Sequence, residues 1–170
     1  MKNILLLALA LALLGSCRNS NKQQVYKPVD WGSRETTVTN LDAMVHGKYY
    51  LPVYSHIYHV HQQTTFDLAI TISVRNVSAS DTVYLFSADY FNTNGEKIRE
   101  YIENPIFINP METIEIVISE KDKAGGSGAN FVFDWATKTD KNPPFIEAVM
   151  ISTLDQQGIS FTTHAVPIAE

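Results

Sequence analysis

Apolar and polar residues alternate strictly along residues 66–75, in the middle of the chain. The apolar positions are Phe66, Leu68, Ile70, Ile72 and Val74, and the positions between them are Asp67, Ala69, Thr71, Ser73 and Arg75. Successive side chains of an extended chain point to opposite faces, so this pattern predicts a β-strand with one buried face.

Similar short segments follow along the chain. Residues 81–91 are apolar on both faces, which suits a central strand. Asn94-Gly95 comes next, and this dipeptide predicts a tight type I′ hairpin turn that returns as a strand over residues 97–102. Further alternating segments lie at residues 114–118, 131–135, 146–151 and 159–168.

No window of a dozen residues shows a 3.6-residue period. The pattern therefore predicts an all-β fold, a two-sheet antiparallel β-sandwich of about eight or nine strands, with an immunoglobulin-like arrangement as a candidate. Residues 38–170 are expected to form this single domain.

The N-terminus has the pattern of a secretory signal. Lys2 precedes an uncharged apolar run of eleven residues, 4–14, and a membrane-spanning helix needs about 20. The run ends in Leu14-Gly15-Ser16-Cys17, which resembles the lipobox of bacterial lipoproteins. The resemblance implies cleavage after residue 16 and lipidation of Cys17; the alternative is an ordinary signal peptide with a chance cysteine. Residues 17–37 are then a polar tether.

Removal of residues 1–16 leaves 170 − 16 = 154 residues, and the net charge changes from −5 to −6 because Lys2 is lost. A mildly acidic chain argues against nucleic acid as a partner. Cys17 is the only cysteine, so disulfides and a blue-copper site are excluded. The expected location is the bacterial cell envelope, at the periplasmic face or the cell surface, with the membrane as a partner through the lipid anchor.

Three of the five histidines lie within residues 54–62. On an extended strand His59 and His61 share a face, and such a pair begins a zinc or copper site that His164 would complete as a third ligand. The alternative is a half-exposed strand in which Tyr54, His56 and Tyr58 form one amphipathic face. We favour the latter, with metal binding as the alternative hypothesis.

Residues 125–130 form a glycine-rich loop, Gly-Gly-Ser-Gly-Ala-Asn. Backbone N–H groups around Gly125, Gly126 and Gly128 suit an anion-binding nest, and Ser127 and Asn130 add polar side chains. The simpler interpretation is a turn whose backbone requires glycine. Ser127 also stands near the spacing of a hydrolase nucleophile elbow, but that elbow precedes a helix and the pattern here predicts a strand.

Five segments, YLPVYSHIYH, ITISVRN, GGSGANF, EAVMIST and QGISF, occur in this order between residues 49 and 161. Together they resemble an uncharacterised family of bacterial envelope lipoproteins, domain of unknown function 3124. The resemblance implies no activity. It marks as family features the glycine loop, Tyr54, Ser55, His56, Tyr58, Glu147 and residues 157–161, whereas His61 and His164 lie outside the pattern.

The sequence thus predicts a lipid-anchored envelope binding module without catalytic activity or cofactor. The candidate ligand-binding residues are the glycine loop with Tyr54, His56 and Tyr58, and the expected ligand is an envelope protein, a glycan or a small anion. The alternatives are a periplasmic zinc or copper protein and a hydrolase with Ser127 as nucleophile.

Overall fold

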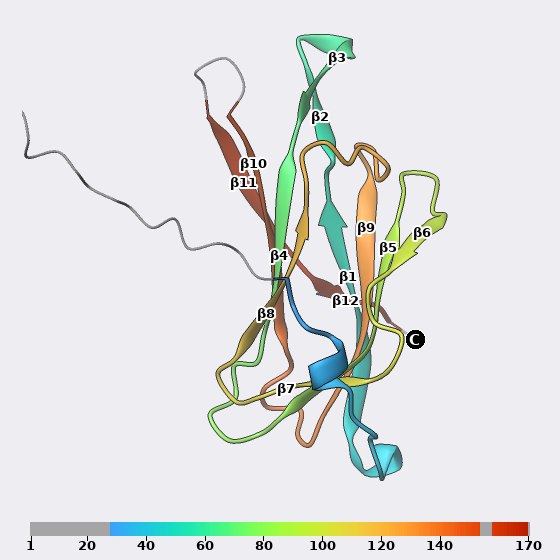
Figure 1. Ribbon diagram of the computed structural model, residues 1–170, viewed down its shortest axis with the longest axis vertical. Helices are drawn as coiled ribbons and strands as arrows, with labels where there is room; N and C mark the ends of the chain where they lie inside the picture. Colours follow the sequence, from blue (N-terminus) through green and yellow to red (C-terminus); the bar gives the residue numbers. More distant parts are fainter. Residues whose placement is uncertain (1–27, 154–157, 170) are drawn as a thin grey trace, which may run out of the picture.

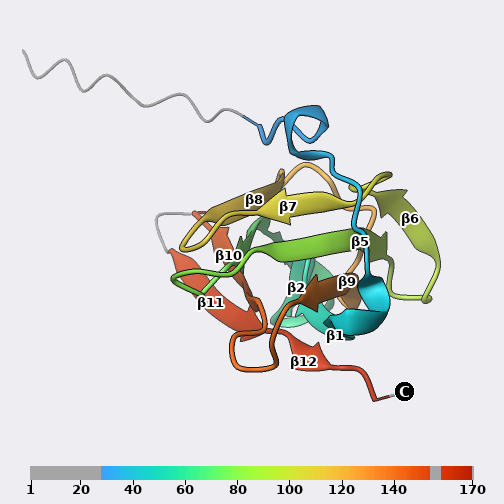
Figure 2. The same cartoon turned by 90° about the horizontal axis from the view of Figure 1, so that it is seen from below.

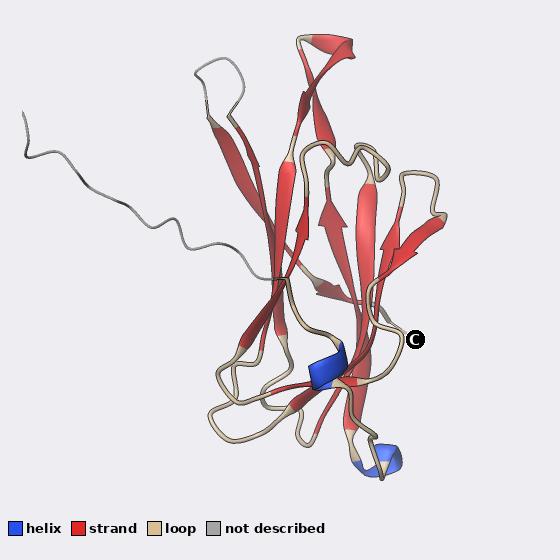
Figure 3. Cartoon of the chain, viewed as in Figure 1, coloured by secondary structure: helices blue, strands red, loops and turns tan. Residues whose placement is uncertain are grey.

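The computed structural model describes residues 28–153 and 158–169. The expected signal peptide and Cys17 lie outside this range. The described chain is a sandwich of two antiparallel sheets, from one end of which a two-stranded hairpin projects (Figures 1 and 3). The predicted all-β sandwich is therefore confirmed.

The larger sheet has the order β12-β1-β9-β5-β6, and β7 also pairs with β5. Its strands are β1 (Val45–Val53), β5 (Val83–Phe91), β6 (Lys97–Glu100), β7 (Ile106–Ile108), β9 (Ala129–Thr137) and β12 (Val166–Pro167). The smaller sheet has the order β11-β10-β4-β8, with β4 (Ala69–Arg75), β8 (Thr113–Ile118), β10 (Phe145–Ser152) and β11 (Ile159–His164). The projecting hairpin consists of β2 (His56–His59) and β3 (His61–Asp67).

The structure contains twelve strands in its described part, more than the eight or nine expected. The additional strands are mainly short: β6, β7 and β12 have four, three and two residues. The strand order differs from that of an immunoglobulin constant domain, in which the first and second strands pair. Here β1 pairs with β9 and β12, and β10 lies beside β4.

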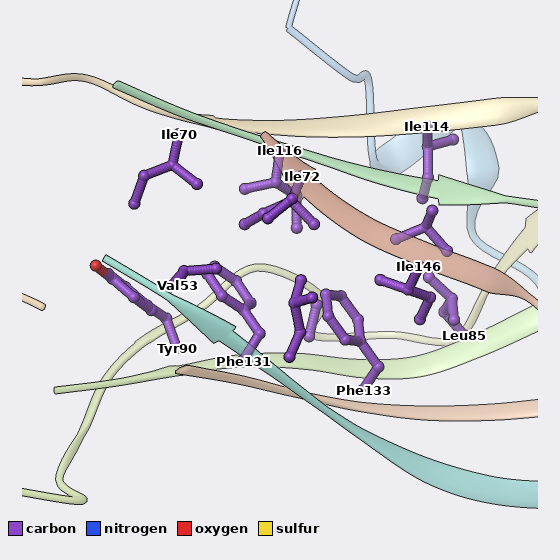
Figure 4. Close-up of a cluster of buried hydrophobic side chains, with 14 of the residues drawn as sticks. Val53, Ile70, Ile72, Leu85, Tyr90, Ile114, Ile116, Phe131, Phe133 and Ile146 are labelled. Carbon is purple, nitrogen blue, oxygen red and sulfur yellow. The ribbon is translucent and has the colours of Figure 1, made fainter. Parts of the chain in front are cut away.

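The core lies between the two sheets and consists of the residues that alternate in the sequence. Ile70, Ile72, Ile114, Ile116 and Ile146 of the smaller sheet face Val53, Leu85, Tyr90, Phe131 and Phe133 of the larger sheet (Figure 4). All ten side chains are buried. Strict alternation in β4 and β8 thus places one apolar row inward, as period two requires.

The turn between β5 and β6 differs from the prediction. Gly95 has a positive φ of 78°, but Asn94 does not, so the turn is not type I′. Asn92 N–H donates to the Glu96 carbonyl (3.0 Å), which encloses a three-residue loop. Asn92 Oδ1 accepts from the N–H groups of Asn94 and Glu96. This side-chain bonding favours the three-residue turn with glycine in the left-handed position.

The N-terminal part of the described chain packs on the sandwich. Trp31 lies against the core, just before the short 3-10 helix η1 (Gly32–Arg34). Glu35 forms a β-bridge with Ile106, and Arg34 forms a 2.6 Å ion pair with Glu112. A second 3-10 helix, η2 (Leu41–Ala43), leads into β1. Of the expected tether, the part from Val29 onward is therefore attached to the domain (Figure 2).

The Arg34–Glu112 pair predicts a pH-dependent contribution to stability. The hydrogen bond from Arg34 lowers the pKa of Glu112 below its ordinary value of 4.5. A depressed carboxyl pKa stabilises the fold above the unfolded pKa, and the contribution is lost as the pH falls through the folded pKa. We expect Glu112→Gln to cost about 0.5–1 kcal/mol at pH 7 and progressively less as the pH falls through the folded pKa of Glu112, as measured by urea unfolding over a series of acidic pH values. A cost that stays constant over the whole series would contradict this account.

Candidate functional site

The glycine loop packs directly on a buried tyrosine. Tyr90 of β5 is fully buried, and its hydroxyl lies 3.0 Å from Ser55 Oγ. The backbone at Gly125 passes so close that an added Cβ would lie 2.0 Å from the Tyr90 hydroxyl oxygen and 2.7 Å from Ala129 Cβ. Only glycine fits at position 125, because no side chain has room there.

Thr93, in the turn after β5, holds the same loop from its other side. Its N–H and its hydroxyl donate to the Gly125 carbonyl (2.9 and 3.1 Å), and its hydroxyl oxygen accepts from Gly128 N–H (2.9 Å). Gly126 has a φ of 79° and its N–H donates to the Lys123 carbonyl. Two of the three N–H groups expected in an anion nest are thus bonded within the protein, which favours the structural interpretation of this loop.

The loop is also joined to the base of the projecting hairpin. Ser55 N–H donates to the Gly126 carbonyl (2.9 Å), and Leu68 N–H donates to the Ser55 carbonyl (2.9 Å). Lys123 Nζ lies 2.7 Å from Asp67 Oδ2. The base of the hairpin, where both of its strands join the sandwich, is therefore held in place beside the glycine loop.

Arg99 of β6 contacts Asp122, which shortly precedes the glycine loop, and the two tyrosines Tyr90 and Tyr101. Its guanidinium donates to the Tyr101 hydroxyl (2.8 Å) and to Asp122 Oδ2 (2.9 Å), and it lies over the rings of Tyr90 and Tyr101. The hydrogen bonds to Tyr101 and Asp122 raise the pKa of Arg99, and burial raises the pKa of Tyr90. Both groups therefore keep fixed protonation states, a cation and a neutral phenol, at neutral pH.

Tyr54 links this end of the larger sheet to the smaller one. Its ring meets Phe161 of β11 edge-on, with centroids 5.7 Å apart. Nearby, the hydroxyl of Thr163 donates to the Pro52 carbonyl (2.6 Å). Asn130 lies at the start of β9, opposite Pro52 of β1 and Phe91 of β5. Tyr54 and Asn130 are therefore half-buried supports for the hairpin base rather than exposed ligands.

The hairpin extends beyond the sandwich at this end (Figure 1). Tyr58 is 59% exposed and Val60, at the tip, is 84% exposed with a positive φ of 62°. A β-branched residue rarely adopts this conformation. His56 pairs with Asp67 across the ladder, and its ring lies 6.1 Å from that of Tyr58. One face of the hairpin thus presents His56 and Tyr58 beside the Lys123–Asp67 ion pair.

Comparison with known proteins gives the family. Residues 46–168 match the family model described as "Protein of unknown function (DUF3124)". The chain belongs to the DUF3124 family. No curated protein matches it. A solved structure titled "Crystal Structure of Thermotoga maritima 1070" is similar at 9% sequence identity, covering 71% of this chain and 92% of that chain, with a TM-score of 0.41.

The DUF3124 sandwich brings the segments of the family resemblance together. The residues 54–56, the glycine loop and Phe161 meet at the end of the sandwich that carries the hairpin. Glu147 lies apart on the outer face of the smaller sheet, where Arg75 donates to its Oε1 from two nitrogens (3.1 and 2.9 Å). Within the described ranges, no helix is long and apolar enough to cross a membrane.

The histidines of this DUF3124 chain do not form the three-ligand arrangement of the alternative metal-binding hypothesis, and the favoured single half-exposed strand is not present either. Residues 54–62 are not one extended strand, because the chain reverses at Val60, and His59 and His61 face each other across the turn. His59 packs on the ring of Phe66, with centroids 4.2 Å apart, and His61 Nδ1 accepts from Gln63 N–H. His164 lies in β11, 3.9 Å from Glu147. Over residues 28–153 and 158–169, no three histidine, cysteine, aspartate or glutamate side chains are grouped as a metal site.

Ser127 stands in the turn before β9, and a strand follows it. A nucleophile elbow requires a strand-to-helix turn, so the local geometry is not that of a hydrolase. The sequence interpretation missed Tyr90 and Thr93, the two side chains around which the loop folds. Neither has a local sequence signal, since their role arises only when β5 lies beside β9.

Proposed function

We propose that this DUF3124 protein is a non-catalytic binding module of the bacterial cell envelope, anchored by lipid at Cys17, that binds its partner through the β2–β3 hairpin. The observation that carries the proposal is the hairpin's projection beyond the sandwich with Tyr58 and Val60 exposed (Figure 1). Isolated two-stranded hairpins are marginally stable in water, so a hairpin that holds Tyr58 and Val60 away from the core is a costly feature without a partner.

The composition of the hairpin supports a binding role. Residues 57–66 contain no aspartate, glutamate, lysine or arginine, although charged residues make up 18% of the chain. Depletion of charge together with exposed tyrosine is typical of the central part of protein interfaces. The base of the hairpin is held by Ser55 and by the Lys123–Asp67 pair. A pre-positioned binding element loses less conformational entropy when its partner binds.

The exposed face of the hairpin suggests the class of partner. The Tyr58 ring offers an apolar platform, and His56, Lys123 and Asp67 offer hydrogen-bonding groups around it. Such a surface suits a protein segment or a glycan, both of which combine apolar and polar faces. A small anion is less well supported, because Gly126 and Gly128 direct their N–H groups inward.

The test is photo-crosslinking of the full chain in the cell that produces it. A benzophenone amino acid replaces Tyr58 in one variant and Met111 in another. Met111 is 71% exposed and lies in the turn between β7 and β8, away from the hairpin (Figure 1). We expect an adduct of defined mass from position 58 only, lost when Val60 is also changed to aspartate. Equal labelling from both positions, or none from position 58, would overturn the proposal.

Anchoring is tested separately by feeding cells an alkyne-tagged palmitate. The wild-type chain is expected to incorporate the label and the Cys17→Ala variant to lack it. An unlabelled wild-type chain would contradict the lipid anchor. The binding role of the hairpin would not be affected, because the crosslinking experiment tests it independently.

A further inference from the structure

The two sheets of the sandwich have free edges, and most of these edges carry a feature that prevents pairing with another chain. Lys97, Arg99 and Glu100 lie in β6, and β12 has only two residues, one of them Pro167. Charged side chains, proline and short length are known protections of edge strands.

The edge strand β7 is protected by the N-terminal segment, because Glu35 forms a β-bridge with Ile106. The edge strand β8 carries a charged residue, Glu115. Arg34 of the N-terminal segment also forms an ion pair with Glu112, just before β8.

β11 has none of these protections. Ile159–His164 contains no aspartate, glutamate, lysine, arginine or proline. All six residues pair with β10 in an unbroken register, so no bulge disturbs the strand. In the part of the chain that the structure describes, the opposite edge of β11 forms no ladder. β11 is therefore a regular, uncharged edge with unpaired backbone groups.

Side-chain contacts to residues at the end of β1 hold β11 in a fixed position. Phe161 packs on Tyr54, and the Thr163 hydroxyl donates to the Pro52 carbonyl. These contacts come from the inner face of β11 and leave Ser160, Thr162 and His164 exposed on the outer face. A row of backbone N–H and C=O groups at an exposed edge is bonded to water, and it offers a template on which another extended chain can pair.

We propose that β11 pairs with β11 of a second copy of this chain, antiparallel about a two-fold axis at Thr162, so that two four-stranded sheets become one continuous sheet. In this register Thr162 faces its own copy, Phe161 faces Thr163, and Ser160 faces His164. Threonine pairs and aromatic pairs with β-branched residues are favourable cross-strand neighbours. No carboxylate, lysine or arginine faces a like charge, because the strand has none.

This dimer goes beyond the proposed function and uses a different surface from the hairpin. Only six residues of each copy form the ladder, so the interface is at the small end of specific interfaces. We therefore expect a weak dimer that forms mainly where copies are concentrated, as on one membrane.

The experiment is disulfide crosslinking of the full chain in isolated membranes. Opposed residues of an antiparallel ladder have Cα atoms about 4.5–5.5 Å apart, which is within the range of a disulfide. Thr162→Cys is therefore expected to form a covalent dimer under mild oxidation. The matched control is Val117→Cys, an equally outward position on β8, and the wild-type chain controls for Cys17.

A several-fold greater dimer yield from Thr162→Cys than from Val117→Cys and wild type supports the proposal. Equal yields overturn it. A reducible adduct with a different protein also overturns it, since the edge would then serve another chain. As a second measurement, Thr162→Lys should abolish concentration-dependent sedimentation of the detergent-solubilised chain, whereas Val117→Lys should not. Retained self-association of a folded Thr162→Lys variant would contradict pairing through β11.

Discussion

Gly125→Ala is expected to be the most damaging single-methyl change in this protein, at about 3 kcal/mol or more of the free energy of unfolding. The added Cβ would lie 2.0 Å from the Tyr90 hydroxyl oxygen and 2.7 Å from Ala129 Cβ. Neither neighbour can move freely, because Tyr90 is fully buried and stacked on Phe131. Urea unfolding of the full chain measures the loss.

Two further variants make this result specific. Gly158→Ala is the matched control, since nothing lies within 4 Å of its Cβ position and its φ is not positive; its effect should be within about 0.5 kcal/mol. Tyr90→Phe removes the clashing oxygen and should reduce the cost of Gly125→Ala, which a double-mutant cycle measures. An equal cost with Tyr90 and with phenylalanine would show that the tyrosine is not the obstacle.

Asn76→Asp should cost a comparable amount although the two side chains have almost the same shape. The Asn76 amide nitrogen donates to the carbonyls of Asp81 (2.8 Å) and Ile108 (3.0 Å), and its oxygen accepts from Ser78 N–H. A carboxylate would face two carbonyl oxygens at a position that is 2% exposed. Loss of both donors and burial of a charge predict a loss of about 3 kcal/mol at pH 7.

The pH dependence separates the charge from the lost hydrogen bonds. Burial beside carbonyl oxygens raises the folded pKa of the introduced carboxyl. The variant is therefore closest to wild type below the unfolded pKa, near 4, and becomes less stable as the pH rises. Asn94→Asp, in an exposed turn, should be nearly neutral at both pH values. A loss at Asn76→Asp that does not grow between pH 4 and pH 7 would contradict the charge argument.

The sandwich was predictable because its strands bury one face each. Ile70, Ile72 and Val74 alternate with less apolar residues and are all buried, so the local pattern is enough to predict the strand and its buried face. The reversal at Val60 was not predictable in the same way, because valine rarely takes a positive φ and no turn dipeptide marks the position.

The candidate site was predictable in part. The glycine run marked the loop correctly, because a backbone without side chains is needed where Gly125 meets Tyr90. That Tyr90 and Thr93 are the partners depends on the pairing of β5 with β9, which are about forty residues apart. Periodicity contains no information on which strands pair, and the same limit applies to His164 and the hairpin histidines.

The weak attachment of the N-terminal segment has a mechanical consequence. Residues 29–36 are held by the packing of Val29 and Trp31 on the core, one ion pair, one β-bridge, the hydrogen bond from Asn104 to Glu35 and few backbone hydrogen bonds. Each sandwich strand, in contrast, belongs to a ladder. A pulling force applied through the chain before residue 28 would peel this segment off first and leave the sandwich folded. The ten residues from Val29 to Val38 would then add roughly 33–36 Å of extended chain. Under tension the distance between the domain and the chain before residue 28 would therefore increase by this length. It would decrease again when Trp31 packs back on the core.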